Sequence, residues 1–346
     1  NNLPPAASTT TSSLSSSSSS TNDGDPIKVI VTSGANQAYT NCVMTLLSEG
    51  DLCVVFKPYY FNHVMAVQMS RGDEALLVGP LDDDGYPSIK WLEDTLQSQR
   101  DGGRIKMVTI TNPGNPTGVS MPRTKLQAMV DLCRDYGVWL IFDNTYEQFD
   151  HTKVNSFPIL NENGTESGEE GFHCFHDEHV MNIFSFSKGY AMAGFRVGYI
   201  ALNTCGDMGR DAYIQMMKIQ DTIPIATSRV SQLAALGALD EGRSWVSEKV
   251  KTLDVGREAI LDALDPLEKI IGGSGAMYIM AKLPANVDDM EISEKLVQEY
   301  GLAVIPGNFC GFPGWIRVCY SNLEPEECKI AAGRLKRGIK ELCFGN

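Results

Sequence analysis

Between residues 28 and 202 the chain repeats one pattern, a short apolar run followed by a stretch long enough for an amphipathic helix. Several runs, such as Val138-Trp139-Leu140-Ile141-Phe142, are apolar at every position, as is typical of strands buried on both faces. Strands of this kind separated by helices predict a mostly parallel sheet with helices on both faces. The predicted strands are 28–32, 52–56, 75–78, 105–111, 138–143, 182–186 and 197–202.

The pattern changes after about residue 205, where three long predicted helices precede two strands and a final helix. We therefore predict an α/β protein with a large domain over residues 27–240 and a smaller C-terminal α+β domain over residues 241–346. Residues 1–26 contain the run Ser15 to Ser20 and no Lys or Arg, which predicts a low-complexity, disordered segment.

Composition excludes several classes of function. The chain carries 43 acidic and 29 basic residues, a formal net charge of −14, which argues against binding nucleic acid. No apolar run approaches the length of a membrane span. Nine scattered cysteines without a C-x-x-C pair favour a reducing compartment, and we expect the cytoplasm. The chain starts with Asn1, so import into an organelle is left open.

Three motifs come at the ends of predicted strands, where ligands bind in α/β folds. Ser33-Gly34-Ala35-Asn36 is a turn into a helix that suits a phosphate, although such a glycine can be purely steric. Asn112-Pro113-Gly114-Asn115-Pro116-Thr117-Gly118 has two Asn-Pro steps, which indicate either a rigid binding loop or only a stiff turn. Asp143 and Tyr146 bring an acid and a phenol to one edge, with helix capping as the alternative for Asp143.

The most informative motif is Ser185-Phe186-Ser187-Lys188, with Arg196 eight residues further on. A lysine in an α/β cleft can form a Schiff base with an aldehyde. Hydroxyl groups and a planar guanidinium suit a phosphate. Most lysines are solvated surface residues, but the apolar, glycine-rich surroundings favour a functional one here. Together the motifs supply what pyridoxal phosphate needs: a lysine, a carboxylate for the ring nitrogen, donors for the phenolic oxygen and a phosphate cup.

These residues resemble the fold-type I, class I/II aminotransferases over residues 27–345. Asn115-Pro116-Thr117-Gly118, Asp143-x-x-Tyr146 and Ser185-x-Ser187-Lys188 with Arg196 arrive in the order of that family. Within it, the chain is similar to plant-type aromatic aminotransferases, which use methionine to aminate aromatic 2-oxo acids. Two of the passages that carry this similarity are Pro58-Tyr59-Tyr60-Phe61-Asn62 and Gly273-x-Gly275-Ala276-x-Tyr278.

The resemblance implies a role for each matching residue. Lys188 would form the Schiff base with pyridoxal phosphate and then act as general base and acid. Asp143 would pair with the protonated pyridine nitrogen, and His63 would either support Asp143 or be a purely structural histidine. The other contacts would come from Asn115 and Tyr146 at the phenolic oxygen, Tyr60 on the ring face, Gly34, Ala35, Asn36, Ser185, Ser187 and Arg196 at the phosphate, and Arg317 with Asn115 at the substrate α-carboxylate.

The resemblance also implies a ping-pong amino transfer between an amino acid and a 2-oxo acid. Family enzymes for dicarboxylic amino acids carry a second Arg where this chain has Lys218–Pro224, which contains Asp221 and no Arg. We therefore expect aromatic or methionine-type substrates. Lys188 and Asp143 would serve a C–S lyase or an aminocyclopropane-carboxylate synthase equally well, so elimination stays open.

The family carries a further segment before the first strand, including a Tyr that reaches the partner subunit's site. The Ser-rich leader does not resemble that segment, so an inactive, truncated domain is a third hypothesis. A homodimer is expected because the family forms its sites at a dimer interface.

The run His173-Cys174-Phe175-His176-Asp177-Glu178-His179 has the residue types of a zinc site. Its spacing matches no recognised zinc pattern, so we predict a polar loop and no metal.

Overall fold

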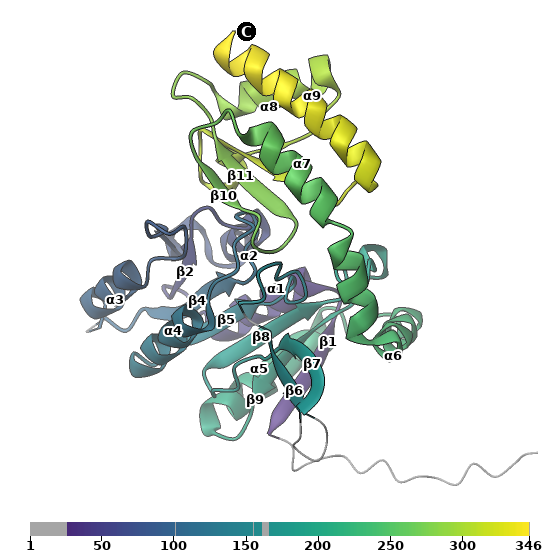
Figure 1. The fold of residues 1–346 in the computed structure, drawn as a ribbon. Helices are drawn as coiled ribbons and strands as arrows, with labels where there is room; N and C mark the ends of the chain where they lie inside the picture. Colours follow the sequence, from purple (N-terminus) through teal and green to yellow (C-terminus); the bar gives the residue numbers. More distant parts are fainter. Residues whose placement is uncertain (1–25, 101, 155, 161–165, 346) are drawn as a thin grey trace, which may run out of the picture.

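The computed structural model describes residues 26–100, 102–154, 156–160 and 166–345, so residues 1–25 of the predicted disordered segment lie outside the described residues. The described chain forms two units, the larger built on a seven-stranded sheet and the smaller on a four-stranded sheet (Figure 1). The large sheet has the order β1 (Ile27–Thr32), β9 (Gly198–Asn203), β8 (Val180–Ser185), β5 (Trp139–Asp143), β4 (Ile105–Thr111), β2 (Leu52–Phe56) and β3 (Leu76–Gly79).

The prediction of a mostly parallel sheet is confirmed. Strands β8, β5, β4, β2 and β3 pair in parallel, whereas β9 runs antiparallel to both of its neighbours, β8 and β1. A parallel return needs a long crossover, usually a helix. Residues 186–197 contain only the short 3-10 helix η2 (Ala193–Phe195), so β9 returns antiparallel. As a result, the segment that carries Lys188 and Arg196 stays at the carboxyl edge of the sheet.

Helices cover both faces of this sheet because side chains alternate along each strand. In β2, Cys53 and Val55 belong to one apolar cluster, and Val54 belongs to the cluster on the opposite face. The first cluster includes side chains of α1 (Ala35–Leu46), α2 (Phe61–Arg71) and α5 (Asp207–Thr222). The second includes side chains of α3 (Ile89–Ser98) and α4 (Arg123–Asp135).

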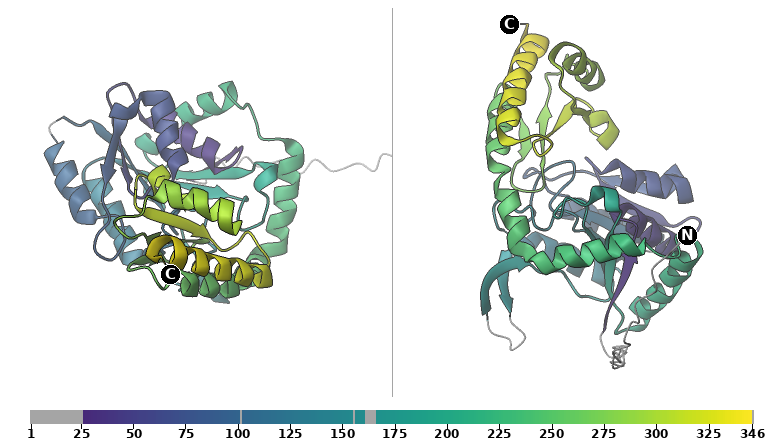
Figure 2. Two further views of the ribbon diagram at one scale, coloured as in Figure 1. Left: turned by 90° about the horizontal axis from the view of Figure 1, so that it is seen from above. Right: turned by 90° about the vertical axis from the view of Figure 1, so that its right-hand side faces the viewer.

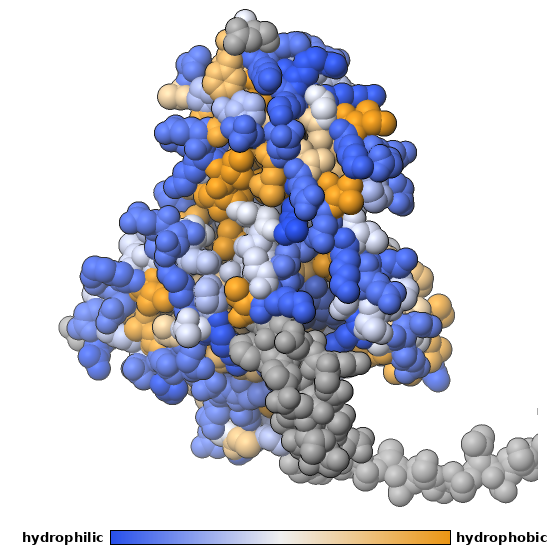
Figure 3. Space-filling view, in the orientation of Figure 1, coloured by the Kyte–Doolittle hydropathy of each residue, from blue (hydrophilic) through white to orange (hydrophobic). Residues whose placement is uncertain are grey.

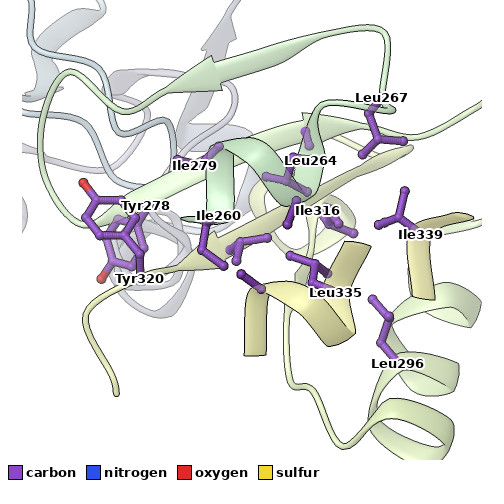
Figure 4. Packing of buried hydrophobic residues seen from close by; sticks show 14 of the residues in the cluster. Ile260, Leu264, Leu267, Tyr278, Ile279, Leu296, Ile316, Tyr320, Leu335 and Ile339 are labelled. Atoms are coloured by element: carbon purple, nitrogen blue, oxygen red, sulfur yellow. The ribbon is translucent and has the colours of Figure 1, made fainter. Parts of the chain in front are cut away.

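The smaller unit packs three helices on an antiparallel sheet of order β10-β11-β13-β12. Its buried core is shown in Figure 4, where aliphatic side chains from the helices and strands meet. Its elements are α7 (Asp254–Leu264), β10 (Ile270–Gly272), β11 (Tyr278–Lys282), α8 (Asp289–Tyr300), β12 (Ile305–Pro306), η3 (Gly307–Cys310), β13 (Trp315–Cys319) and α9 (Pro325–Phe344).

Helix α6 (Arg229–Lys251) connects the two units. It kinks at Gly242, whose φ of 79° and ψ of 177° are not helical. The right-hand view of Figure 2 shows the chain running along the large unit and then turning towards the small one. The predicted domain boundary at residue 241 lies one residue before this kink and stays a prediction.

The remaining described elements are η1 (Asp73–Ala75) and an antiparallel pair, β6 (Ser156–Leu160) with β7 (Glu166–Phe172). Among the described helices, none has the length and apolar content needed to cross a lipid bilayer.

The loop after β4 joins the two units. The carbonyl oxygen of Gly118 accepts hydrogen bonds from the backbone N–H groups of Ser274 and Gly275, at 3.2 and 2.9 Å. The backbone N–H of Ser120 donates to the hydroxyl of Ser274 at 3.0 Å. These bonds place the β10–β11 connection directly over the loop that carries Asn115.

Candidate active site

One pocket at the carboxyl edge of the large sheet brings together most of the residues singled out in the sequence. Arg317 lies beside it, since its guanidinium donates to the side-chain oxygen of Asn115 at 3.0 Å. Gly34 lies against the guanidinium of Arg196. The pocket is lined by Ala35, Asn36, Tyr60, Asn115, Asp143, Thr145, Tyr146, Ser185, Ser187, Lys188, Ala193 and Arg196.

A buried carboxylate–imidazole pair forms the floor of the site. Strand β5 ends at Asp143, whose Oδ2 lies 3.0 Å from Nε2 of His63 on α2. His63 in turn stacks on Tyr39, with 4.0 Å between ring centroids. The other oxygen of Asp143 accepts two hydrogen bonds from Thr145, one from the backbone N–H at 3.0 Å and one from the hydroxyl at 2.6 Å.

These contacts decide the charge of Asp143. Burial by itself would raise the pKa of this carboxyl, but the hydrogen bond and charge of His63, with the two bonds from Thr145, hold the pKa below its ordinary value. A buried acid in this state remains a carboxylate near neutral pH, and it can hold a cation in the pocket.

The opposite end of the pocket suits an anion. Helix α1 begins after Gly34, which has no side chain to cap the helix, and Ala35 and Asn36 of its first turn line the pocket. First-turn N–H groups have no partner within their own helix, so this end of the pocket offers donors and the positive end of the helix dipole. Gly34 has a φ of 84°, and a Cβ there would lie 2.4 Å from Nη2 of Arg196. The glycine therefore lets the guanidinium approach the turn.

Arg196 is held in place by the backbone. Its Nη1 donates to the carbonyl of Ala193 at 2.8 Å and its Nη2 to the carbonyl of Ser33 at 3.3 Å. The hydroxyl of Ser185 accepts the backbone N–H of Ser187 at 3.1 Å, which orients this turn just before Lys188.

A chain of hydrogen bonds crosses from the small unit into the pocket. Asn115 accepts from Arg317 and, through Nδ2, donates to the hydroxyl of Tyr146 at 3.5 Å. The Tyr146 hydroxyl lies 2.9 Å from that of Tyr278. Burial, followed by the neighbouring Tyr278 and Asp143, raises the pKa of Tyr146 well above its usual range, so the phenol keeps its proton.

Tyr60 covers another side of the pocket. Its ring meets His63 edge-on at 5.2 Å, and its hydroxyl accepts from Asn62 at 2.7 Å and donates to Asn36 at 3.4 Å. Burial raises the pKa of Tyr60, which keeps this hydroxyl neutral.

Sequence reasoning missed two contributors. Thr145 gives Asp143 two hydrogen bonds, and the signal was its place two residues after a strand-ending Asp, where a hydroxyl can form a local turn. Tyr278 was noted in a family passage, but nothing local indicated that it contacts Tyr146, because the two lie 132 residues apart.

Asp221 does not have the position that would let it repel an acidic substrate. Asp221 lies on the exposed side of α5 and does not line the pocket of its own chain, so repulsion of an acidic substrate by this carboxylate is not supported within one protomer.

The histidine-rich run does not gather around one point. His179 is buried and its Nε2 lies 2.9 Å from the carbonyl oxygen of Val130, whereas Cys174 contacts His176. Across the described residues, no group of three or more His, Cys, Asp or Glu side chains could hold a metal ion.

The arrangement fits a ligand with an anionic group at one end, a protonated ring nitrogen at the other and a carbonyl near Lys188. This fit rests on the donor set: a guanidinium and helix N–H groups at one end, and an ionised buried carboxylate at the other.

Comparisons with known proteins agree with this geometry. The family model for aminotransferase class I and II matches residues 5–335, and the chain belongs to this family. The aromatic aminotransferase ISS1 of Arabidopsis thaliana is 42% identical over 91% of this chain and 75% of that protein. The 1-aminocyclopropane-1-carboxylate synthase 1 of rice (Oryza sativa subsp. indica) is 28% identical over 93% of this chain and 67% of that protein.

Solved structures with a similar fold are also aminotransferases. The crystal structure of an aspartate aminotransferase from Thermotoga maritima matches with a TM-score of 0.74 and 26% identity, over 89% of this chain and 75% of that one. The fold-type I architecture predicted from the motifs is thereby confirmed. The chain is an aminotransferase of class I/II, an enzyme that moves an amino group between an amino acid and a 2-oxo acid.

Proposed function

We propose that the chain uses pyridoxal phosphate, held by the pocket around Lys188, to transaminate aromatic or methionine-type amino acids. The observation that carries the proposal is that Lys188, the Asp143–His63 pair and the Arg196 anion site all meet in one pocket. When bound, this cofactor supplies an aldehyde for a lysine amine and an electron sink for the substrate's amino carbon.

Each end of the pocket has a matching task. The guanidinium of Arg196, the N–H groups of Ala35 and Asn36, and the hydroxyls of Ser185 and Ser187 would hold the phosphate. Gly34 permits this arrangement by leaving room for the guanidinium.

Tyr60, which lines the pocket, would stack on the face of the ring. Asp143 would keep the pyridine nitrogen protonated, with His63 and Thr145 maintaining the carboxylate charge. Asn115 and Tyr146 would donate to the phenolic oxygen. Lys188 would bind the aldehyde and, once released by the substrate, carry the proton at the substrate's amino carbon.

Arg317 would bind the substrate α-carboxylate. Its Nη1 is held by Asn115, while its buried Nε makes no hydrogen bond within the described structure. A guanidinium held in this way can offer a fork to a carboxylate. The aromatic preference is supported by the relative of 42% identity, which is named an aromatic aminotransferase.

A half-reaction tests the proposal. The protein loaded with pyridoxal phosphate is mixed with L-tryptophan, L-phenylalanine, L-methionine or L-aspartate, and the 2-oxo acid and free ammonia formed in a single turnover are measured. Steady-state rates are then measured with a second 2-oxo acid added as the amino acceptor. We expect 2-oxo acid from the first three, no ammonia, and the highest kcat/KM for one of them. Ammonia in proportion to substrate consumed would indicate a lyase, and the highest kcat/KM with aspartate would contradict the substrate preference.

We also propose that the chain forms a homodimer, because α6 presents an apolar stripe to solvent. Val230, Leu233, Leu236 and Leu239 are each at least half exposed. The three leucines line a groove together with exposed Val29 and Val31 of β1. Figure 3 shows orange, apolar side chains at the lower right, where α6 lies in Figure 1. Patches of this kind mark interfaces.

Sedimentation of wild type and of a Leu233→Glu, Leu236→Glu double variant tests the dimer. We expect a dimer for the wild type and a monomer for the variant, whereas a monomeric wild type would exclude this proposal. We also propose a cytoplasmic location, with import into an organelle left open, because all nine cysteines are free thiols.

A further inference from the structure

Tyr278 belongs to the small sheet, yet its hydroxyl contacts that of Tyr146, which lines the pocket of the large unit. It begins β11 and pairs with Cys319 of β13, two residues beyond Arg317 on that strand. Figure 4 shows Tyr278 beside Tyr320 at one end of the small core. The two tyrosines share this core but not their hydroxyl partners, since Tyr278 meets Tyr146 and Tyr320 donates to the carbonyl of Ala276 at 2.9 Å.

Most hydrogen-bond donors and acceptors around Tyr146 can be assigned from the chemistry of the groups. A guanidinium only donates, so the oxygen of Asn115 faces Arg317 and the Nδ2 of Asn115 faces Tyr146. That Nδ2 also only donates, so the oxygen of Tyr146 accepts there. The single hydroxyl proton of Tyr146 is therefore left either for Tyr278 or for a ligand in the pocket.

We propose that Tyr278 is a positioning residue that donates to Tyr146, so that the proton of Tyr146 is directed at the phenolic oxygen of the cofactor. The inference rests on the proposed function, because it requires pyridoxal phosphate in this pocket. A hydroxyl that accepts a hydrogen bond becomes a stronger donor, so Tyr278 strengthens the bond from Tyr146 to the cofactor.

The aromatic ring of Tyr278 makes a second contact, with Arg317. It lies under the guanidinium of Arg317, 4.5 Å from the ring centroid to the guanidinium carbon. One side chain thus holds both the donor to the cofactor and the arginine for the substrate carboxylate. Removing the hydroxyl and removing the ring should therefore have separable effects.

Both hydroxyls are protonated near neutral pH, because burial raises the pKa of Tyr146 and of Tyr278. The other charged or titratable groups that face this pair, or share its pocket, are Asp143, Tyr60, Lys188, Arg196, Arg317 and Cys319.

The test is a pH titration of the visible absorption band of the protein-bound cofactor in Tyr278→Phe, with Tyr320→Phe as matched control. The control loses a buried hydroxyl from the same core without touching the pocket. A weaker bond from Tyr146 stabilises the phenolic oxygen less, so the cofactor–Lys188 nitrogen keeps its proton to higher pH. We expect the apparent pKa of the band to rise by about half a unit or more in Tyr278→Phe, and to stay at the wild-type value in Tyr320→Phe.

Tyr278→Met, which also lacks the hydroxyl, gives the same test if Tyr278→Phe does not fold. Because Tyr278→Met also loses the ring, we expect its KM for the amino acid to rise about threefold, whereas Tyr278→Phe keeps the wild-type KM and loses kcat.

Three results would overturn the inference. They are an unchanged pKa in both Tyr278 variants, a rise of equal size in Tyr320→Phe, or a lower pKa in Tyr278→Phe. If the wild-type protein shows no cofactor band at all, the proposed function itself fails, and this outcome is distinct from the other three.

Discussion

Gly118 should be the most sensitive glycine at the junction of the two units. Its φ is 69°, and a Cβ at this position would lie 1.8 Å from the carbonyl oxygen of Tyr278, a backbone atom of β11. Since real Cβ atoms essentially never approach another atom within 3.0 Å, the strand or the loop must move by more than an ångström in Gly118→Ala. The substitution therefore acts on the whole contact between the Asn115 loop and the small sheet.

The expected loss of stability in Gly118→Ala has two parts. A non-glycine residue in the left-handed region costs about 1 kcal/mol, and overpacking a tight contact costs about 1–3 kcal/mol more. We expect Gly118→Ala to lower the free energy of unfolding by about 2–4 kcal/mol.

Gly137→Ala is a matched control, because Gly137 has a φ of 66° and nothing within 4 Å of its Cβ position. It should cost about 1 kcal/mol, the backbone part alone. Urea denaturation followed by circular dichroism measures both variants. If Gly118→Ala and Gly137→Ala lose the same free energy, the close approach to Tyr278 is not a determinant of stability and the reasoning fails.

Two further predictions concern the pocket. In His63→Phe we expect the midpoint of acid unfolding to move to higher pH. In the wild type the pKa of Asp143 lies below its ordinary value of 3.8, so the carboxylate stabilises the fold above pH 3.8. This contribution is lost as the pH falls through the pKa of the folded state. Without His63, burial raises the pKa of Asp143, so the loss begins at higher pH; an unmoved midpoint would show that His63 does not set this charge. In Arg317→Lys the charge remains but the fork is lost, so KM for the amino acid should rise about 10-fold or more at constant cofactor affinity. An unchanged KM in steady-state kinetics would place the substrate carboxylate elsewhere.

Local sequence patterns were sufficient to predict most elements of the large unit. The apolar runs at β2, β4 and β5 are fully or almost fully buried. A strand buried on both faces is apolar at almost every position, and this pattern can be recognised in the sequence. Strand direction was less predictable, because the apolar pattern of β9 is the same whether it runs parallel or antiparallel. The short connection that follows β8 decides the direction, and it does so through geometry.

In the pocket, too, some residues could be predicted from local sequence patterns and others could not. Lys188 and Asp143 were identified because each ends or follows a strand of the large sheet, whose carboxyl edges meet in space. Tyr278 comes from a different sheet, and its place beside Tyr146 depends on how the two units dock through Gly118. Contacts of that kind arise from tertiary packing and leave no local pattern.

The most direct test of the central claim is chemical capture of the lysine that binds the cofactor. The protein is incubated with pyridoxal phosphate, reduced with borohydride, digested and mapped by mass spectrometry, with Lys188→Ala treated in parallel. We predict one pyridoxyl-modified peptide, with the adduct on Lys188, and no adduct in the variant. An adduct on another lysine, or equal labelling of wild type and variant, would contradict the assignment of this pocket as the active site.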